Sequence, residues 1–161
     1  MTSSTKVRTC LWFDNNGEQA AQFYVSLIPG SNIENIFCPD PSEPPLMIEF
    51  NLAGTPYLIL NAGPMFPHTE AASISVTTKD QVETDFLWQA LIAEGGSASQ
   101  CAWLKDRFGL SWQIVPEVLP QLLADSDTEA ARRVMQTMMG MQKIDISQLQ
   151  AAFNNTYIKE K

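Results

Sequence analysis

The order of predicted elements repeats along the chain, and this repeat limits the possible folds more than any other feature of the sequence. Residues 7–13 read as a buried strand, an amphipathic helix follows, and three strand-like segments come next. The same order of strand, helix and three strands starts again near residue 72, which is 65 residues after the first start. The sequence therefore predicts an α+β fold built from two βαβββ modules.

The two predicted helices are marked by the spacing of their apolar residues and by the residues at their ends. In the first helix, apolar residues recur at i, i+3, i+4, i+7 and i+8, starting at Ala20. The second helix is predicted to begin with a capping box between Thr78 and Gln81. Its predicted apolar face consists of Val82, Phe86 and Ala90 with the neighbouring Leu87 and Leu91. Between the modules, prolines and glycines in residues 63–68 predict a linker.

The end of the chain adds a third predicted region, which is helical. Asp127 and Asp145 are suitable N-caps for two helices there. Short helices are marginal in water, so we expect them to pack on the rest of the protein. A methionine stripe predicts packing on the domain or across a dimer interface, or else an adaptable binding surface, through Met135, Met138, Met139 and Met141. The predicted organisation is one domain over 1–161, with modules at about 5–62 and 70–116 and a tail at 117–161.

Charge and composition exclude several kinds of partner. The chain carries 10 Lys and Arg against 18 Asp and Glu, a net charge of -8, so we expect no nucleic-acid partner. We also expect no membrane span, because no apolar run approaches the roughly 20 residues that a bilayer requires.

Residues 1–6 are polar and do not resemble a signal peptide, and the 3 cysteines are an odd number. These features predict reduced thiols and a cytoplasmic protein.

Four stretches of the sequence resemble one known family. They lie at residues 11–24, 61–71, 100–116 and 131–146, and QCAWLKDRFGLSWQIVP at 100–116 is the most specific. On these residues the chain is similar to the PhnB-like branch of the vicinal-oxygen-chelate superfamily, which includes glyoxalases, bleomycin-resistance proteins and dioxygenases. The resemblance implies two modules around a shared cleft and a homodimer. Superfamily members are metal-dependent lyases, isomerases, dioxygenases or thiol transferases, or proteins that bind and sequester a drug.

Members of this branch often carry a label as methyltransferases of the ubiquinone pathway. A nucleoside cofactor is usually cradled by a glycine-rich turn that follows a strand and opens a helix. In this sequence Gly95 and Gly96 follow a predicted helix instead. The sequence therefore does not predict methyl transfer.

The resemblance also bears on metal binding, because metal-using relatives hold the ion with four ligands from the first and last strands of each module. Carried over by position, these ligands correspond to Thr9, Asn61, Ser73 and Gln113. None of the four is an acid or an imidazole, and neutral oxygen donors compete poorly with water for divalent ions. We therefore expect no metal and no cofactor.

Alternation along the strands predicts which residues line the cleft. In residues 73–77, the serines and Thr77 share one face, while Ile74 and Val76 share the other. By the same reasoning, Cys10 is predicted to lie on the helix-covered face of the first strand. The predicted ligand-binding cleft, with apolar walls and neutral hydrogen-bonding groups, consists of Thr9, Leu11, Phe13, Asn61, Ser73, Ser75, Trp103 and Gln113. Such a cleft suits a small neutral or weakly polar ligand.

Three functions remain open on the sequence alone, and whether the protein is an enzyme stays undecided. The first is a metal-independent small-molecule-binding protein. The second is a lyase, isomerase or dioxygenase that uses a metal at other ligands, or uses Glu49 or Glu70 as a base with a raised pKa. The third is an interaction protein whose tail helices hold a partner. A homodimer is expected from the resemblance and from the need to cover edge strands.

Four other sites have a structural and a functional interpretation. His68 is expected to be a solvated loop residue rather than a base. Cys10 and Cys101 are expected to be inert buried thiols rather than nucleophiles. Residues 105–107 carry charges that are expected to solvate a turn, with binding of an anionic ligand as the alternative.

Overall fold

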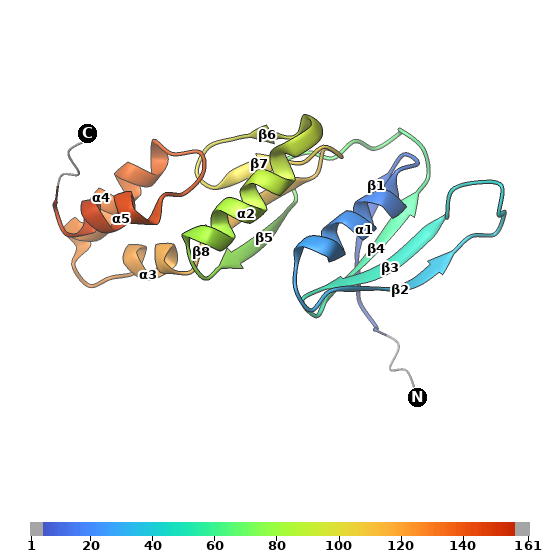
Figure 1. Cartoon of the computed structure of the whole chain (residues 1–161), viewed down its shortest axis with the longest axis horizontal. Helices are drawn as coiled ribbons and strands as arrows, with labels where there is room; N and C mark the ends of the chain where they lie inside the picture. Colours follow the sequence, from blue (N-terminus) through green and yellow to red (C-terminus); the bar gives the residue numbers. More distant parts are fainter. Residues whose placement is uncertain (1–4, 157–161) are drawn as a thin grey trace. The chain divides into compact units, whose positions relative to one another are not determined.

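The chain forms two compact units in the computed structural model, which describes residues 5–156 (Figure 1). The first unit ends at His68, the last residue of the predicted linker, and the second unit begins at Thr69. Each unit contains one helix laid on a mixed sheet of four strands, so the prediction of an α+β fold with two βαβββ modules is confirmed. A single domain over 1–161 stays a prediction, and residues 1–4 and 157–161 of that range lie outside the described residues.

The first unit follows the predicted order of elements. In its sheet the strands are arranged β1-β4-β3-β2, with β1 parallel to β4 and the other pairs antiparallel. The turn between β3 and β4 is formed by Ala53 and Gly54, which both have positive φ, at 47° and 87°. The elements are β1 (Thr9–Phe13), α1 (Gly17–Leu27), β2 (Asn32–Phe37), β3 (Met47–Leu52) and β4 (Thr55–Asn61).

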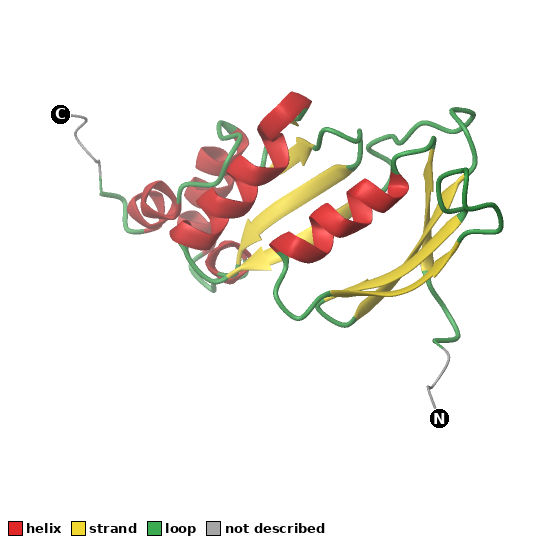
Figure 2. Cartoon of the chain, turned by 45° about the vertical axis from the view of Figure 1, so that its right-hand side comes forward, coloured by secondary structure: helices red, strands yellow, loops and turns green. Residues whose placement is uncertain are grey.

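Helix α1 covers one face of the first sheet, as Figure 2 shows. Ala20, Ala21 and Tyr24 of the helix are fully buried. The helix and the sheet lie very close together at Gly17, where an added Cβ would lie 2.3 Å from Cγ2 of Ile59 and 2.4 Å from Oδ1 of Asn61. A glycine at the start of α1 therefore lets the helix lie directly on β4.

The second unit repeats this arrangement with shorter strands. Its strands are arranged β5-β8-β7-β6, and β5 runs parallel to β8. The elements are β5 (Ser73–Thr78), α2 (Gln81–Ile92), the 3₁₀ turn η1 (Ala93–Gly95), β6 (Ser97–Ala98), β7 (Trp103–Lys105) and β8 (Ser111–Pro116).

Helix α2 buries only part of the predicted face: Leu87 and Leu91 are buried as predicted. The side chains of Val82 and Phe86 are 78% and 55% exposed, so the prediction that they are buried is wrong. The buried face is formed by Thr84, Leu87, Trp88 and Leu91. The helix is capped by Asp80, which accepts a hydrogen bond from the backbone N–H of Glu83, rather than by Thr78. Thr78 is itself buried and shares a hydrogen bond of 2.7 Å with the Thr84 hydroxyl.

Three helices follow the second sheet and belong to the same unit (Figure 2). They are α3 (Val118–Leu123), α4 (Thr128–Met139) and α5 (Ile146–Phe153). The predicted N-caps are confirmed: Asp127 accepts from the N–H of Ala130 and Asp145 from that of Gln148. Together the helices enclose a small apolar cluster, here called the tail core, formed by Ala102, Leu119, Val134, Met141, Ile144 and Leu149.

None of the helices within residues 5–156 combines the length and the apolar character needed to cross a bilayer.

Candidate functional site

The face of the second sheet opposite α2 carries the predicted cleft residues of the second module. The strand register pairs Ser75 with Gln113 and Gln113 with Trp103, so these side chains share one face, and Ser73 lies on it as well. The Gln113 side-chain amide donates a hydrogen bond of 2.8 Å to the Ser73 hydroxyl. Ser75 is exposed, while Ser73, Trp103 and Gln113 are half-buried. The predicted alternation is therefore confirmed in this unit, and we call this surface the second open face.

Lys105 lies on the same face and is neutralised there by an acid. Its register partner in β8 is Ser111, and its ammonium donates a hydrogen bond of 2.8 Å to the carboxylate of Glu70. This hydrogen bond lowers the pKa of Glu70, and the backbone N–H of Glu70 and the charge of Lys105 act in the same direction. The alternative in which Glu70 is a base with a raised pKa is therefore not supported, because this carboxylate is exposed beside a cation.

We expect the replacement Lys105→Met to move the pKa of Glu70 back up toward its ordinary value. The depressed pKa makes the pair stabilising above the unfolded-state value of about 4.3, and this contribution is lost as the pH falls through the folded-state pKa. Carbon-detected NMR titration of the Glu70 carboxyl in both proteins measures the shift. Lys79→Met, which removes an exposed lysine from the same unit, is the control and should leave the Glu70 titration unchanged. An unchanged low pKa in Lys105→Met would show that the cation does not cause the shift.

In the first unit, the prediction of which β1 side chains face the cleft is wrong by one residue. β1 pairs in parallel with β4, so that Leu11 lies beside Ile59 and Phe13 beside Asn61. Leu11 and Phe13 are 7% and 3% exposed, and Asn61 faces the start of α1. These predicted cleft residues therefore lie on the helix-covered face, and Thr9 shares their side of the strand. The opposite side, here called the first open face, carries Cys10 and Trp12.

Asn61 has a structural role that its position in the sequence did not reveal. Its carboxamide oxygen accepts a hydrogen bond of 2.9 Å from the backbone N–H of Gly17, at the start of α1. Its amide donates a hydrogen bond of 2.7 Å to the carbonyl oxygen of Pro45 in the loop before β3. Asn61 thus caps α1 from a neighbouring strand and holds the β2–β3 loop, which accounts for an amide that is only 8% exposed.

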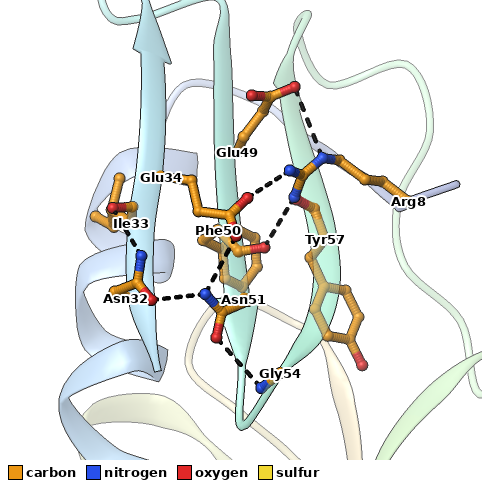
Figure 3. Close-up of polar contacts among 9 residues, drawn as sticks. All are labelled: Arg8, Asn32, Ile33, Glu34, Glu49, Phe50, Asn51, Gly54 and Tyr57. Atoms are coloured by element: carbon orange, nitrogen blue, oxygen red, sulfur yellow. Dashed lines mark hydrogen bonds and ion pairs between the residues drawn. The ribbon is translucent and has the colours of Figure 1, made fainter. Parts of the chain in front are cut away.

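A network of charged side chains occupies the first open face and was not anticipated (Figure 3). The Arg8 guanidinium forms an ion pair with Glu34, and its Nε lies 3.7 Å from Oε1 of Glu49. Its Nη1 also donates to the carbonyl oxygens of Phe50 and Tyr57, at 3.4 Å and 3.3 Å. Glu49, one of the two candidate bases, is therefore held beside a cation rather than in an apolar pocket. The sequence indicated this network only through Arg8 and Glu49, two charged residues in otherwise apolar segments.

The charged turn at residues 105–107 is organised around a buried acid rather than solvated. Asp106 is 2% exposed and accepts hydrogen bonds from the backbone N–H groups of Phe108 and Leu110, at 2.8 Å and 3.1 Å. It also accepts a hydrogen bond of 2.8 Å from the indole N–H of Trp112. Arg107 pairs with Glu94 and lies over the ring of Phe108. Since Lys105 and Arg107 each have a carboxylate partner, the turn is poorly suited to binding an anionic ligand.

The lone histidine and the cysteines also differ from expectation. His68 is half-buried, and its ring lies edge-on to Phe13 with the ring centroids 5.0 Å apart. Cys10 is exposed on the first open face rather than covered by α1, and Cys101 is half-buried. Partial burial of its sulfur nevertheless raises the pKa of Cys10, which leaves less reactive thiolate at neutral pH.

The donor groups of the two units do not fit a divalent metal ion. Ser73 and Gln113 offer neutral oxygens, and Asn61 is committed to Gly17 and Pro45 beneath α1. The carboxylates on the open faces are paired with Lys105 and Arg8. Among residues 5–156, no three side chains of the His, Cys, Asp or Glu type are grouped so that they could hold an ion.

Comparison with known proteins identifies the family. The sequence model of a family described as 3-demethylubiquinone-9 3-methyltransferase matches residues 5–115. A PhnB protein from Bacillus cereus is 27% identical, with a TM-score of 0.64 over 70% of this chain and 99% of that one. Protein PA1353 from Pseudomonas aeruginosa is 22% identical, with a TM-score of 0.58 over 71% of this chain and 98% of that one.

A more distant likeness extends to a resistance protein. FosX from Listeria monocytogenes, a fosfomycin resistance protein, is 13% identical, with a TM-score of 0.53 over 78% of this chain and 100% of that one. At this identity the likeness concerns the fold alone. A search of curated proteins found no match. Because the family model spans more than half of the chain, this protein belongs to the PhnB-like family described as 3-demethylubiquinone-9 3-methyltransferase, within the vicinal-oxygen-chelate superfamily.

Proposed function

We propose that this protein binds a small neutral or weakly polar molecule, without a metal ion, at the second open face. The observation that carries the proposal is the grouping of Gln113, Ser73 and Trp103 on the side of the sheet opposite α2. Ligand sites combine apolar surface with a few well-placed polar groups, and this face offers the Trp103 indole beside the polar side chains of Ser73 and Gln113.

The chemistry of the face indicates the class of ligand. Hydroxyl and carboxamide groups both donate and accept hydrogen bonds, so Ser73, Ser75 and Gln113 can bind an amide or a hydroxyl of either polarity. The half-buried indole of Trp103 offers a flat surface for an aromatic or other planar group. The charge of Lys105 is balanced by Glu70, so the face does not favour an anion. We therefore propose a ligand with a flat apolar ring and one neutral hydrogen-bonding group.

The methyl transfer named in the family description is not part of this proposal. Gly95 and Gly96 follow α2, whereas a nucleoside-binding loop precedes its helix. A carboxylate-based reaction is also less well supported, because Glu70 has a lowered pKa and Glu49 is paired with Arg8.

We further propose a cytoplasmic homodimer. The edge positions of β1 and β5 in their own sheets support association, because an exposed strand edge favours pairing.

The test is NMR titration of the labelled protein with benzamide and with phenol, which carry a flat ring and a neutral polar group. We expect the signals of the Trp103 indole N–H and the Gln113 side-chain amide to shift, with affinity in the millimolar range that suits such small probes. In Trp103→Leu, which removes the indole signal, the shift of the Gln113 side-chain amide should disappear. Phe86→Leu is the matched control, because Phe86 is exposed on α2 on the opposite side of the sheet. Shifts confined to other surfaces, or unaffected by Trp103→Leu, would refute the proposed site.

Thermal melting of chelator-treated protein with divalent ions tests the absence of a metal. We expect no increase in Tm with any ion. An ion bound at 100 times its dissociation constant would stabilise the protein by about 2.7 kcal/mol, so a clear increase would favour a metal-dependent enzyme instead.

A further inference from the structure

The turn between β6 and β7 contains two consecutive residues in a backbone conformation that favours glycine. Cys101 and Ala102 have φ angles of 55° and 73°, in the left-handed region. Residues with a Cβ are disfavoured there because the Cβ approaches the backbone carbonyl oxygen. Such a conformation persists only where the surrounding structure imposes it, so the contacts of this turn are informative.

These contacts come from the C-terminal region. The backbone N–H of Cys101 donates to the carbonyl oxygen of Met141 at 2.8 Å, and that of Ala102 donates to Gln142 at 2.8 Å. Ala102 is 2% exposed and belongs to the tail core, together with Val134 and Leu149. The segment between α4 and α5 therefore holds both strained residues by their backbones, and the helices hold one of them by its side chain.

The strained turn leads directly into the second open face. Trp103 is the next residue, and β7 is only three residues long. The carbonyl oxygen of Ala102 accepts a hydrogen bond of 2.9 Å from Ile114 in β8, and the Trp103 N–H donates to Gln100 at 3.1 Å. Because the dihedral angles of Ala102 set the direction in which the chain enters β7, they also set where the Trp103 indole lies beside Gln113.

We propose that the C-terminal helices act as a clamp that positions Trp103 for ligand binding by holding residues 101–102 in the left-handed conformation. This inference rests on the proposed function at the second open face. It assigns a role to the region after residue 116, which lies beyond the segment matched by the family model. Trp103 contacts the ligand in this scheme, whereas the tail core acts through Trp103 as a positioning element.

Amide hydrogen exchange on the full chain tests the clamp without a ligand. We expect the amides of Cys101 and Ala102 to exchange at rates close to those of the buried amides of α4 and α5, and faster than those of β5. Leu149→Ala, which creates a cavity in the tail core, should accelerate exchange at 101 and 102 and broaden the Trp103 indole signal. Unchanged exchange at these two amides, while the α5 amides exchange faster, would overturn the proposal.

A rescue experiment with benzamide as the probe separates the clamp from a general structural effect. If Leu149→Ala leaves the turn correctly formed in about a tenth of the molecules, benzamide binding weakens by on the order of tenfold. Adding Cys101→Gly should recover much of this loss, because glycine adopts the left-handed conformation without a steric cost. Ile144→Val is a milder second variant for use if Leu149→Ala does not fold. Normal binding in either folded variant, or the absence of rescue, would refute the clamp.

The two proposals fail in different ways. If the wild-type protein does not bind benzamide or phenol, the proposed function fails, and exchange at residues 101–102 together with the Trp103 signal still decides whether the clamp exists. If the wild-type protein binds and Leu149→Ala binds equally well, the proposed function stands and the clamp is wrong.

Discussion

Replacing Asp106 with alanine is expected to lower the free energy of unfolding by about 4 kcal/mol, one of the two largest losses predicted here. The carboxylate is buried and accepts hydrogen bonds from two backbone N–H groups and from the indole N–H of Trp112. Alanine would leave all three donors without this acceptor, and the hydrogen bonds from Leu110 and Trp112 are buried. Urea denaturation of both proteins, followed by circular dichroism, measures the difference.

Asp106→Asn is the matched control for this prediction. Its carboxamide oxygen can still accept from the N–H groups of Phe108 and Leu110, while its NH₂ group would face the Trp112 indole donor. We expect a loss of about 1–2 kcal/mol, because one hydrogen bond is lost rather than three. A loss from alanine no larger than that from asparagine would show that the three hydrogen bonds are not what holds the turn.

Replacing Gly17 with alanine is expected to cost about 3 kcal/mol, because the first sheet has no room for the added methyl group. The new Cβ would lie 2.3 Å from Ile59 and 2.4 Å from Asn61, both well inside van der Waals contact. To relieve this overlap α1 must move away from β4, which would also stretch the hydrogen bond from Gly17 to Asn61. Thermal or urea denaturation measures the loss.

Gly140→Ala serves as the control for the same substitution where space is available. A Cβ at Gly140 would meet the carbonyl oxygen of Thr137 at 3.5 Å, an ordinary contact, and the φ of Gly140 is −87°. We expect a change of less than about 0.5 kcal/mol there. A Gly17→Ala protein as stable as the Gly140→Ala protein would mean that α1 does not pack on β4 as closely as described.

The sequence predicted which strand face the helix covers in the second module but not in the first. The reason is the distribution of polar and apolar side chains along the strands. In β5, Ser73 and Ser75 alternate with Ile74 and Val76, so only one face is apolar enough to lie beneath α2. β1 has bulky apolar residues on both faces, with Leu11 and Phe13 on one face and Trp12 on the other. Alternation therefore could not indicate which side α1 would cover.

The predicted N-cap of α2 was wrong, because the helix starts two residues later than expected. Thr78 and Gln81 match a capping box, but Asp80 provides the cap and Gln81 instead bonds to the segment before α5. Gln81 donates to the carbonyl oxygen of Ile144 and accepts from the N–H of Ile146. A local pattern could not anticipate that a residue 65 positions away would compete for this side chain.

By itself, the sequence determined the α+β class, the repeated βαβββ order, the family and the caps at Asp127 and Asp145. These features follow from local periodicity, local hydrogen bonds and motifs that remain contiguous along the chain. Only the tertiary structure decided which face of β1 is covered, that Arg8 engages Glu34 and Glu49, and that Asp106 is buried beneath its turn. The same holds for the tail core that encloses Ala102 beside Trp103. Each of these depends on side chains far apart in sequence that compete for the same space and the same hydrogen-bonding partners, and folding alone brings them together.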